Sequence, residues 1–537
     1  MKRNYKYSKH ITGNKLGLAL VSVMALAVTA CTKNFDKYNT NPNSLSKSQS
    51  ASIASTAFGP MEQAIYSNYQ RAQNLSADGY SGYMQPGIAF GGDRNNLTYD
   101  MNDGWNTTGF NDQYTMVMSP VHAIATTTTI KQTNPEMWAV ALLIQVEAMD
   151  RVTDRFGPIP YTKVATSLTT APYDDQPTVY QTFFKQIDTA VTNLKAYIAA
   201  NPGKTSLGAS DYIYAGNYAE WLKFANSLRL RLAMRIVKID PATAQTQAVE
   251  ALNDAGGTLT TPTDDAAIAQ TGGRENDLHQ ISGDWNNTNM SAAIESYMVG
   301  YNDPRLSVYF QPAQAGAGAY AGQFVGIRAG SLIGSSQSTY SNFANLNTTQ
   351  TFLFSTPQLI MTAAEVWFLK AEAALRGWTA ASVQSNYEAG IAASMNQWNV
   401  SIGSYLSDGT STEANFTDPL NAVNNATALS TITIKWDNSA TQEQMLERII
   451  TQKWLAIFPD GQEAWADYRR TGYPKLFPVA NNFSGGTIST DVQVRRLPYP
   501  STEYTNNGPA VNNAVKLLGG ADNGGTRLWW DVNKANF

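Results

Sequence analysis

The sequence predicts a mainly α protein, built from paired antiparallel helices that carry large irregular, loop-rich insertions. Apolar residues recur at three- and four-residue steps over several long stretches, which is typical of amphipathic helices. Short turns rich in Gly and Pro separate neighbouring stretches, so the helices of a pair must run antiparallel. Between Ala255 and Asn347 this periodicity fades into Gly-, Ser- and Asn-rich sequence, which predicts loops with a few short strands or helices.

Length and composition limit the classes of protein that the chain can belong to. With 537 residues and 43% apolar residues, the chain is long enough to bury a large core. Charged residues make up 15% of the chain and the formal net charge is −4. Such a chain has no basic field that would attract a polyanion, so we expect no nucleic acid partner.

Residues 1–30 have the pattern of a lipoprotein signal peptide. Basic residues precede an apolar run over residues 16–28, which is too short to span a bilayer comfortably. The run leads into Val-Thr-Ala before Cys31, the only cysteine of the chain, and this resembles a bacterial lipobox. The resemblance implies that Cys31 carries acyl chains that hold the protein at a membrane. The alternative is an ordinary thiol behind a signal peptide that is cut elsewhere.

Residues 31–50 are polar and rich in Asn and Ser, which predicts a flexible tether between Cys31 and the body at residues 51–537. Helical patterning begins beyond the tether, and the first helix with a marked start begins at Asn134-Pro135. Two further helices follow it before the irregular region. Their apolar stripes are Trp138 to Val152, Phe183 to Ile198, and Trp221 to Ile236.

A second set of helices is predicted after the irregular region. One begins at Thr356-Pro357 and ends before Gly377, and the next has its apolar stripe from Val383 to Met395. Gly390 inside the second helix costs about 1 kcal/mol relative to Ala, so we expect close contact with the partner helix there.

The clearest helix pair is predicted between Leu446 and Leu476. The first helix ends at Pro459, where a short turn begins. Asp460 is expected to cap the second helix while Glu463 reaches back in a capping box. Gly472 and Pro474 then stop the second helix. The Gly-rich tail, residues 481–537, is expected to wrap the helical body.

Residues that could perform catalysis are sparse. His122 and His279 are the only histidines after the signal peptide, and neither a nucleophile elbow nor a zinc or phosphate-binding motif occurs. We therefore expect no metal and no cofactor, and we expect His122 in a core or at a helix end. Glu365 and Glu372 could suggest a catalytic site together with nearby basic residues, but we interpret the set as structural ion pairs between helices. These basic residues are Arg229, Arg231, Arg235, Arg469 and Arg470.

An ordered set of motifs resembles the SusD/RagB family of nutrient-binding outer-membrane lipoproteins, particularly its second SusD-like subgroup. The match spans nearly the whole chain. The motifs are the lipobox at Cys31, DRFGPIPY at 154–161, YDDQPTVY at 173–180, WLKFANSLRLRLAMR at 221–235, DPRL at 303–306, FVGIRAG at 324–330, MTAAEVWFLKAEAALRGW at 361–378, ITQKWLAIFPDGQEAWADYRRTGYPKL at 450–476 and RLPYP at 496–500. The resemblance implies a frame of tetratricopeptide-type helix pairs at the cell surface. It also implies a SusC-like TonB-dependent transporter barrel as partner.

Aromatic residues in polar loops are the candidates for ligand binding. A sugar ring offers an apolar face and a rim of hydroxyls, so its receptor needs flat aromatic rings beside hydrogen-bonding side chains. The loops from Tyr80 to Tyr114 and around residue 285 have this mixture, and the family binds ligand through aromatics on irregular segments. The candidate ligand-binding residues are Trp105, Tyr99, Trp285, Asn96, Asn106 and Asn286. The alternative is that these rings anchor their own loops to the frame.

The sequence thus predicts a lipid-anchored outer-membrane protein, facing the cell exterior, that captures an oligosaccharide or a peptide without catalysis. Delivery to the transporter barrel is the expected next step. A glycan-degrading surface enzyme remains an alternative, because glycoside hydrolysis needs only two carboxylates about 5 to 10 Å apart. A helical-repeat scaffold that binds no small ligand is the third interpretation.

Overall fold

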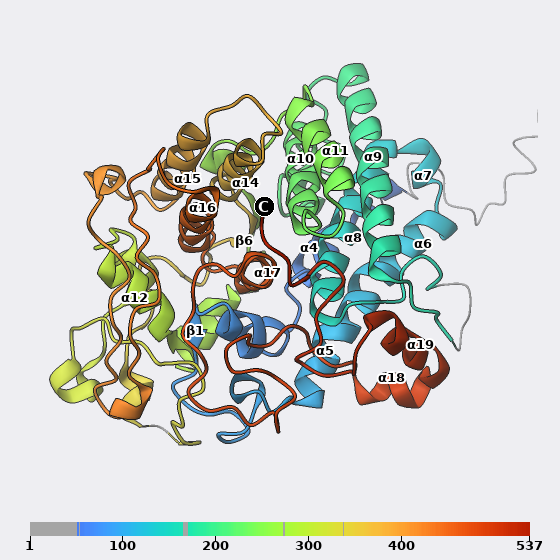
Figure 1. The fold of residues 1–537 in the computed structure, drawn as a ribbon. Coiled ribbons are helices and arrows are strands. Elements are labelled where there is room, and N and C mark those ends of the chain that lie inside the picture. The colour runs from blue at the N-terminus through green and yellow to red at the C-terminus, as the bar shows by residue number, and fades with distance from the viewer. Residues whose placement is uncertain (1–50, 53, 165–169, 272–273, 337) are drawn as a thin grey trace, which may run out of the picture. The chain divides into compact units, whose positions relative to one another are not determined.

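The computed structural model describes residues 51–537 except 53, 165–169, 272–273 and 337. The predicted signal peptide, Cys31 and the predicted tether lie outside the described residues. The chain divides into two units, Met1–Ser52 and Ile53–Phe537. The elements and contacts that follow belong to the second unit, in which helices predominate (Figure 1).

A first group of helices confirms the pattern predicted before the irregular region. Each helix packs against the next along the chain. The group consists of α8 (Pro135–Phe156), α9 (Gln176–Ala200), α10 (Tyr218–Arg235) and α11 (Pro241–Asn253). Helix α8 stops at Gly157, whose φ of 92° is open to glycine but strained for other residues. Asp175 begins α9 by accepting the N–H of Thr178 at 2.9 Å.

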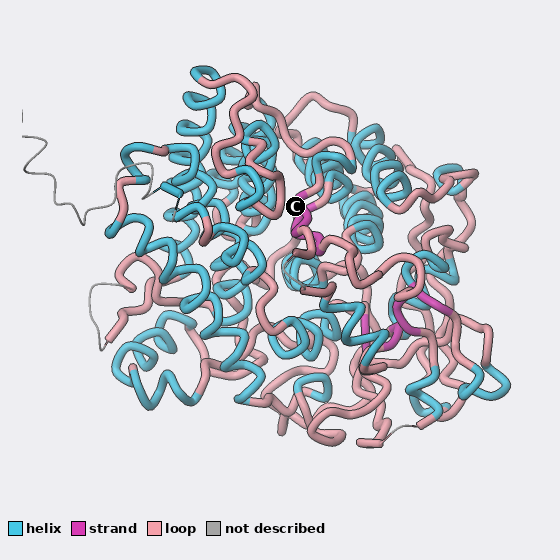
Figure 2. Tube along the Cα trace, turned by 180° about the vertical axis from the view of Figure 1, so that it is seen from behind, coloured by secondary structure: helices cyan, strands magenta, loops and turns pink. Residues whose placement is uncertain are grey.

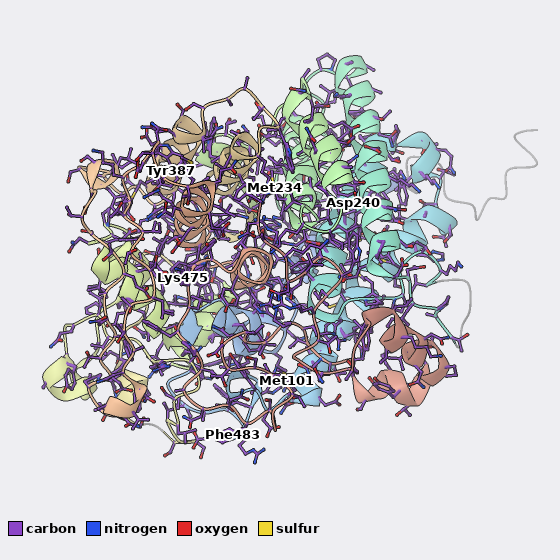
Figure 3. All side chains as sticks on the ribbon, in the orientation of Figure 1. Met101, Met234, Asp240, Tyr387, Lys475 and Phe483 are labelled. Carbon is purple, nitrogen blue, oxygen red and sulfur yellow. The ribbon has the colours of Figure 1, made fainter. Side chains whose placement is uncertain are left out.

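A second group of helices packs beside the first. It consists of α14 (Ala363–Leu375), α15 (Val383–Gln397), α16 (Gln442–Ala456) and α17 (Gly461–Thr471). Helix α14 packs against α15, α16 and α10, so it joins the two groups. A Cβ added to Gly390 of α15 would lie 2.8 Å from the ring of Phe368 on α14, which confirms the predicted close contact. Figure 3 shows side chains throughout the space between the helices, and Met234 and Tyr387, labelled there, are buried.

The predicted start of α14 at Thr356-Pro357 is wrong. Strand β6 (Gln358–Met361) comes first and pairs antiparallel with β2 (Ala266–Ile268). Thr362 then caps the helix, because its side chain accepts the N–H of Glu365 at 3.2 Å. The apolar residues of β6 fit a helical stripe equally well, so only the distant partner strand decides their conformation.

The helix–turn–helix at α16 and α17 is confirmed, with one difference in its cap. Asp460 accepts the N–H of Glu463 at 3.3 Å, and Gly472 ends α17 with a φ of 84°. The carboxylate of Glu463 does not reach back to the cap, because it binds Lys453 at 2.9 Å and also Arg235. The two apolar stripes face neighbouring elements: α16 packs on α14 and α15, and α17 packs on η1.

The segment before α8 holds more helix than predicted. Its helices are α4 (Phe58–Ala64), η1 (Gln70–Asp78), α5 (Asp103–Gln113), η3 (Tyr114–Met118), α6 (Ser119–Thr127) and α7 (Ile130–Thr133). The loop predicted from Tyr80 to Tyr114 therefore ends at α5, where Asn102 caps by accepting the N–H of Trp105 at 3.1 Å. Packing of α5 on η1 favours the helix despite its weak apolar pattern. His122 is exposed on α6, so its predicted place in a core or at a helix end is wrong.

The region from Ala255 to Asn347 has the predicted irregular character, and its short strands lie among loops in Figure 2. An antiparallel sheet has the strand order β1-β3-β5-β4, with Met84 opposite Met290 and Phe310 opposite Leu346. The strands are β1 (Met84–Gln85), β3 (Asn289–Met290), β4 (Phe310–Gln311) and β5 (Asn345–Leu346). The helices of this region are α12 (Ala292–Gly300) and α13 (Leu306–Tyr309).

Short helical turns connect these elements. They are η2 (Asn96–Thr98), η4 (Gly208–Ser210), η5 (Pro262–Asp264), η6 (His279–Asp284), η7 (Ala315–Tyr320), η8 (Thr339–Asn342), η9 (Tyr405–Ser407) and η10 (Ala422–Asn424). Turn η6 is a π-helix, a form that is rare and is found frequently at functional sites. Strand β5 of the four-stranded sheet packs against it.

The tail lies against the helical frame, as predicted. The N–H of Leu497 donates to the carbonyl of Arg155 at 2.7 Å, and Arg496 donates to the carbonyl of Phe156 at 2.8 Å. Two helices of the tail were not predicted, α18 (Ser501–Asn506) and α19 (Gly508–Leu518). Among the described residues, no helix combines the length and apolar character needed to cross a membrane.

Candidate functional site

The charged residues that the sequence places on facing helices form buried ion pairs. Arg231 lies at the centre: its guanidinium group contacts Glu365 at 2.6 Å and Glu147 at 3.1 Å. Lys453 contacts Asp467 at 2.7 Å. All of these side chains are almost completely buried. The carboxylates are therefore neutralised by fixed cations inside the frame, which confirms their structural interpretation.

Glu372 of α14 has the same structural role as Glu365. Its carboxylate accepts from Arg470 at 2.6 Å and from Arg376 at 2.8 Å. Burial opposes its ionisation, but the two guanidinium groups lower the pKa of Glu372 to about 2. A carboxyl group that stays ionised in this way cannot donate a proton near neutral pH.

Arg469 departs from the predicted pattern of ion pairs. It donates to the carbonyl oxygens of Asp154 at 2.6 Å and Arg495 at 3.0 Å, and it belongs to no ion pair of the described residues. Its guanidinium group lies over the ring of Trp465, 3.6 Å from the centroid. Arg229, by contrast, pairs with Glu250 at 2.5 Å as predicted.

His279 is half-buried, and its Nδ1 lies 2.8 Å from the carbonyl oxygen of Phe352. Within the described ranges, no group of three or more His, Cys, Asp and Glu side chains is arranged to hold a metal ion.

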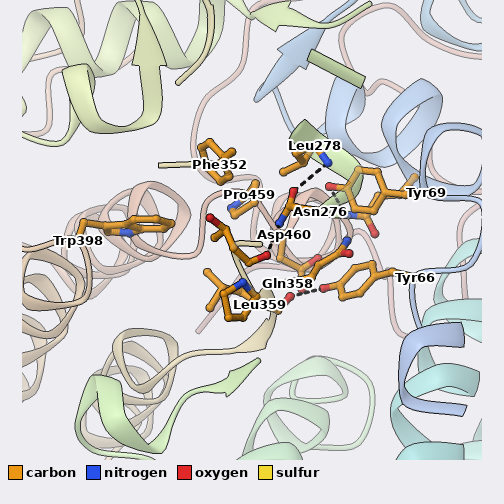
Figure 4. Close-up of a pocket in the computed structure, with 13 residues that line it drawn as sticks. Tyr66, Tyr69, Asn276, Leu278, Phe352, Gln358, Leu359, Trp398, Pro459 and Asp460 are labelled. Atoms are coloured by element: carbon orange, nitrogen blue, oxygen red, sulfur yellow. Dashed lines mark hydrogen bonds between the residues drawn. The ribbon is translucent and has the colours of Figure 1, made fainter. Parts of the chain in front are cut away.

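A small cavity lies next to the residues that lead into η6 (Figure 4). Tyr66 and Tyr69 line one side of it, and Trp398 lines the opposite side. Asn276 bridges its wall, because the amide donates to the carbonyl of Thr356 at 3.0 Å. The volume of about 20 Å³ leaves room for about one water molecule. A sugar ring cannot enter, so we assign this cavity to packing.

Three of the predicted binding residues are buried: Asn96 and Tyr99 in the segment before α5, and Asn106 in α5 itself. The amide of Asn96 donates to Asn106 Oδ1 at 3.2 Å, and Asn96 Oδ1 accepts the N–H of Asn102 at 2.6 Å. Tyr99 is only 4% exposed and packs edge-on against Tyr80, with 6.5 Å between the ring centroids. These side chains hold the loop to α5 and are covered by protein, so the proposal below does not use them.

Trp105 is half-buried near the start of α5. Its backbone N–H binds the capping side chain of Asn102. The neighbouring Asp103 accepts the N–H of Ser501 at 2.8 Å, so this end of α5 also meets the tail.

Trp285 differs from the other tryptophans of the chain. It is 45% exposed, and none of the other eleven has an exposed side chain. Its position is nevertheless fixed, because its N–H donates to the carbonyl of Gln280 at 2.9 Å and thereby closes the end of η6. A large flat ring held in water without covering side chains loses apolar burial, and such exposure is typical of binding surfaces.

The residues after Trp285 hold its turn against the sheet. Asn286 adopts a left-handed conformation with a φ of 49°, which Asn tolerates better than most residues. Its amide donates to the carbonyl of Ser341 at 3.0 Å, while its Oδ1 is buried without a hydrogen-bond partner. The N–H of Asn287 donates to the carbonyl of Ile281 at 2.8 Å. The ring is therefore presented on a rigid turn, which lowers the entropy lost on binding.

A second exposed ring lies at the other end of η6. Phe354 is 49% exposed, and its ring lies 6.4 Å from that of His279, the first residue of η6. The carbonyl of Phe354 also accepts the N–H of Asn276 at 2.9 Å. We call the set Trp285, Asn286, His279 and Phe354 the η6 surface.

Of the residues of the η6 surface, the sequence prediction named Trp285 and Asn286 but not Phe354 or His279. The signal for Phe354 is the short apolar run Phe352-Leu353-Phe354 within a polar stretch. Phe352 is buried there, whereas Leu353 and Phe354 are exposed. The run alone does not show which of its residues turns outward.

The fold combines two features: paired helices form a frame, and an irregular region presents exposed aromatic rings. Comparison with known proteins identifies the family. A sequence model of the SusD-like family, described as SusD and RagB outer membrane lipoprotein, matches residues 33–531. The chain belongs to this family, and it is an outer membrane lipoprotein of the surface nutrient-binding class.

Solved structures agree with the family assignment. A chitin-binding SusD homologue from Flavobacterium johnsoniae is 41% identical, with a TM-score of 0.86, over 90% of this chain and 100% of the other. A SusD homologue from Bacteroides vulgatus is 35% identical, with a TM-score of 0.84, over 90% and 98% of the two chains. A SusD-like protein from Bacteroides thetaiotaomicron is 35% identical, with a TM-score of 0.82, over the same shares. No curated protein matches the chain.

Proposed function

We propose that the protein captures an oligosaccharide on the η6 surface and delivers it to a SusC-like TonB-dependent transporter barrel, without breaking bonds in its ligand. The observation that carries the proposal is the exposed ring of Trp285 on a hydrogen-bonded turn. The ring offers an apolar platform, and the exposed carboxylate of Asp284 beside it offers acceptors for sugar hydroxyls. Phe354 would support a second sugar unit.

The energy available at such a surface suits capture followed by release. A stacked sugar ring that buries on the order of 100 Å² of apolar area gains about 2.5 kcal/mol before ordering costs. Two platforms then give millimolar to micromolar affinity. A ligand held in this range dissociates fast enough to pass to a transporter.

The ligand we propose to test first is a β-linked N-acetylglucosamine oligosaccharide, since a 41% identical homologue is named as chitin-binding. Acetamido groups add an amide to each sugar ring, and this amide can exchange hydrogen bonds with side chains beside an aromatic platform. A peptide remains the alternative ligand, because aromatic platforms with amide neighbours serve both classes.

Isothermal titration of the full chain in detergent with chitin oligosaccharides, other glycans and peptides tests the proposal. Trp285→Ala should weaken binding of the best ligand by at least about tenfold, which corresponds to about 1.4 kcal/mol. Trp398→Phe serves as a control, because this half-buried ring lines the small internal cavity and should leave affinity unchanged. Equal affinity of wild type and Trp285→Ala would place the ligand elsewhere.

The membrane anchor at Cys31 is the second part of the proposal. Two or three acyl chains hold a protein at a membrane far more firmly than one, at about 0.8 kcal/mol per buried CH₂. Cys31→Ser should move the protein from the membrane fraction to the soluble fraction. A variant that still sediments with membranes would contradict lipidation at this position.

A further inference from the structure

A basic groove lies where the residues after α10, the end of α17 and the tail meet. Its volume is about 420 Å³, within the range of small-molecule sites. Among its lining residues only Glu443 is acidic, although the whole chain has a net charge of −4. The basic lining residues are Lys238, Arg469, Arg470, Arg495, Arg527 and Lys534. The groove shares no residue with the η6 surface.

Some of these charges are neutralised by the protein itself. Arg470 is held by Glu372, as described above. Arg495 and Arg527 share a single carboxylate, that of Asp531, with 2.7 Å from Arg495 Nε and 2.7 Å from Arg527 Nη1. Two guanidinium groups on one carboxylate leave an excess of positive charge at this wall.

Lys238 lacks a carboxylate partner. Its Nζ donates to the carbonyl of Arg470 at 3.1 Å, and it takes part in no ion pair of the described chain. Burial of its side chain, together with the nearby guanidinium group of Arg470, lowers the pKa of Lys238 to about 8. The ammonium group is thus partly desolvated without a counter-charge, a state that an anion would relieve.

Arg469 and Lys534 complete the unpaired set. Arg469 is only 2% exposed, yet its Nη2 has no hydrogen-bond partner. A buried guanidinium N–H without an acceptor lacks the hydrogen bond that would offset its desolvation, so an acceptor on a ligand would be favourable there. Lys534, which also lines the groove, is exposed and belongs to no ion pair of the residues described.

We propose that this groove binds an oxyanion, a carboxylate, sulfate or phosphate group on a small ligand, held by Lys238, Arg469 and Lys534. Guanidinium forks and ammonium groups both form short charge-assisted hydrogen bonds to such oxygens. Lys238 is half-buried, Arg469 is buried and Lys534 is exposed, so the three cations of the groove differ in their access to solvent.

The charge of Lys238 makes binding depend on pH. The groups that act on it are Arg470 from α17, Glu443 from α16, and Asp531 and Arg527 from the tail. Burial also lowers the pKa of Arg469, to about 9, so Lys238, with a pKa of about 8, loses its charge before Arg469 does. Affinity for an anion of constant charge should therefore fall as the pH rises from about 7 to about 9.

Isothermal titration of the full chain in detergent with sodium sulfate, against sodium chloride of equal ionic strength, tests the proposal. Sulfate keeps its charge over the whole pH range. Wild type should bind it saturably, and both Lys238→Met and Lys534→Gln should lower the affinity at least about tenfold. The control Lys516→Gln removes an exposed lysine of α19 outside the groove and should bind sulfate like wild type.

Glucuronate and glucose 6-phosphate, titrated in the same way, show which oxyanion the groove prefers. Because Lys534 is exposed, Lys534→Gln should fold normally and tests the groove even if Lys238→Met does not fold. The proposal would be overturned if wild type bound none of the three probes saturably. It would also be overturned if Lys534→Gln bound them as tightly as wild type does. Binding of a neutral oligosaccharide should be unaffected by Lys534→Gln, so this result is independent of the function proposed for the η6 surface.

Discussion

Carboxyl groups that are shielded from solvent have different partners, and therefore different pKa values, in the helical frame and in the irregular region. In the frame, Glu372 lies between Arg470 and Arg376, which hold its pKa at about 2 against the cost of burial. In the irregular region, Glu295 of α12 is paired with no cation among the described residues. Burial raises the pKa of Glu295 to about 8, although the N–H of Gly326 donates to its carboxylate at 2.6 Å.

This difference separates the helices that hold the chain together from the region that carries the exposed rings. In the frame, ionised side chains connect helices that are far apart in sequence, and their charges are cancelled inside the protein. In the irregular region, backbone amides and neutral side chains fix the turns, and rings such as Trp285 stay exposed. Segments of this sequence that are rich in charged residues therefore indicate packing between helices. They do not indicate the η6 surface.

The largest expected effect is on the charge network of the frame. Arg231→Met leaves Glu147 and Glu365 buried without their central cation, and we expect the free energy of unfolding to fall by about 3 to 5 kcal/mol. Chemical denaturation measures this free energy. Arg94→Met is the matched control, since Arg94 pairs with Asp100 at 2.9 Å on the surface and should cost about 0 to 1 kcal/mol. Similar losses in both variants would remove the distinction between the two environments.

A smaller effect is expected from close helix packing. Gly390→Ala puts a Cβ 2.8 Å from the Phe368 ring, so the free energy of unfolding should fall by about 1 to 3 kcal/mol despite the better helix propensity of Ala. Gly508→Ala at the start of α19 is the control, because no atom lies within 4 Å of the added Cβ. Thermal denaturation of both variants compares them, and a stabilised Gly390→Ala would show that α14 and α15 separate easily.

The pH dependence of stability tests the neutral carboxyl group of Glu295. Its pKa rises from an ordinary value of 4.5 to about 8 on folding, so the folded state holds a proton that the unfolded chain releases between these values. Stability contributed by this proton is present below pH 4.5 and is lost as the pH rises towards 8. Between about pH 6 and 7, wild type should lose up to about 1.4 kcal/mol more than Glu295→Gln, which cannot titrate. Parallel denaturation curves for the two proteins would contradict this.

The smallest expected effect on stability is that of Trp285→Ala. The ring is 45% exposed and its turn is held by backbone hydrogen bonds, so the free energy of unfolding should change by no more than about 0.5 kcal/mol. Trp465→Ala, which empties a buried site, should cost about 3 to 5 kcal/mol in the same assay. A large loss of stability in Trp285→Ala would favour an anchoring role for this ring.

Sequence reasoning predicted the elements whose signals are local. Gly472 ended α17 where expected, and Asp460 capped it. It missed features that depend on distant partners. Strand β6 forms because β2 lies beside it. The carboxylate of Glu463 does not cap the helix because Arg235 and Lys453 bind it. Such contacts join residues far apart in the chain, and no short-range pattern carries them.

The candidate site shows the same limit. Sequence composition pointed to aromatics in polar loops, and it placed Trp285 and Tyr99 in one class. The two differ in exposure: Tyr99 is covered by its packing against Tyr80, whereas Trp285 is 45% exposed.

The sequence by itself determined the helical frame, its family and the paired charges inside it, because helix periodicity, caps and glycine stops act over a few residues. Tertiary structure alone decided which rings face solvent and which basic residues, among them Lys238, meet in a groove without counter-charges. Exposure and net local charge depend on all the segments that pack around a residue, and these come from every part of the chain.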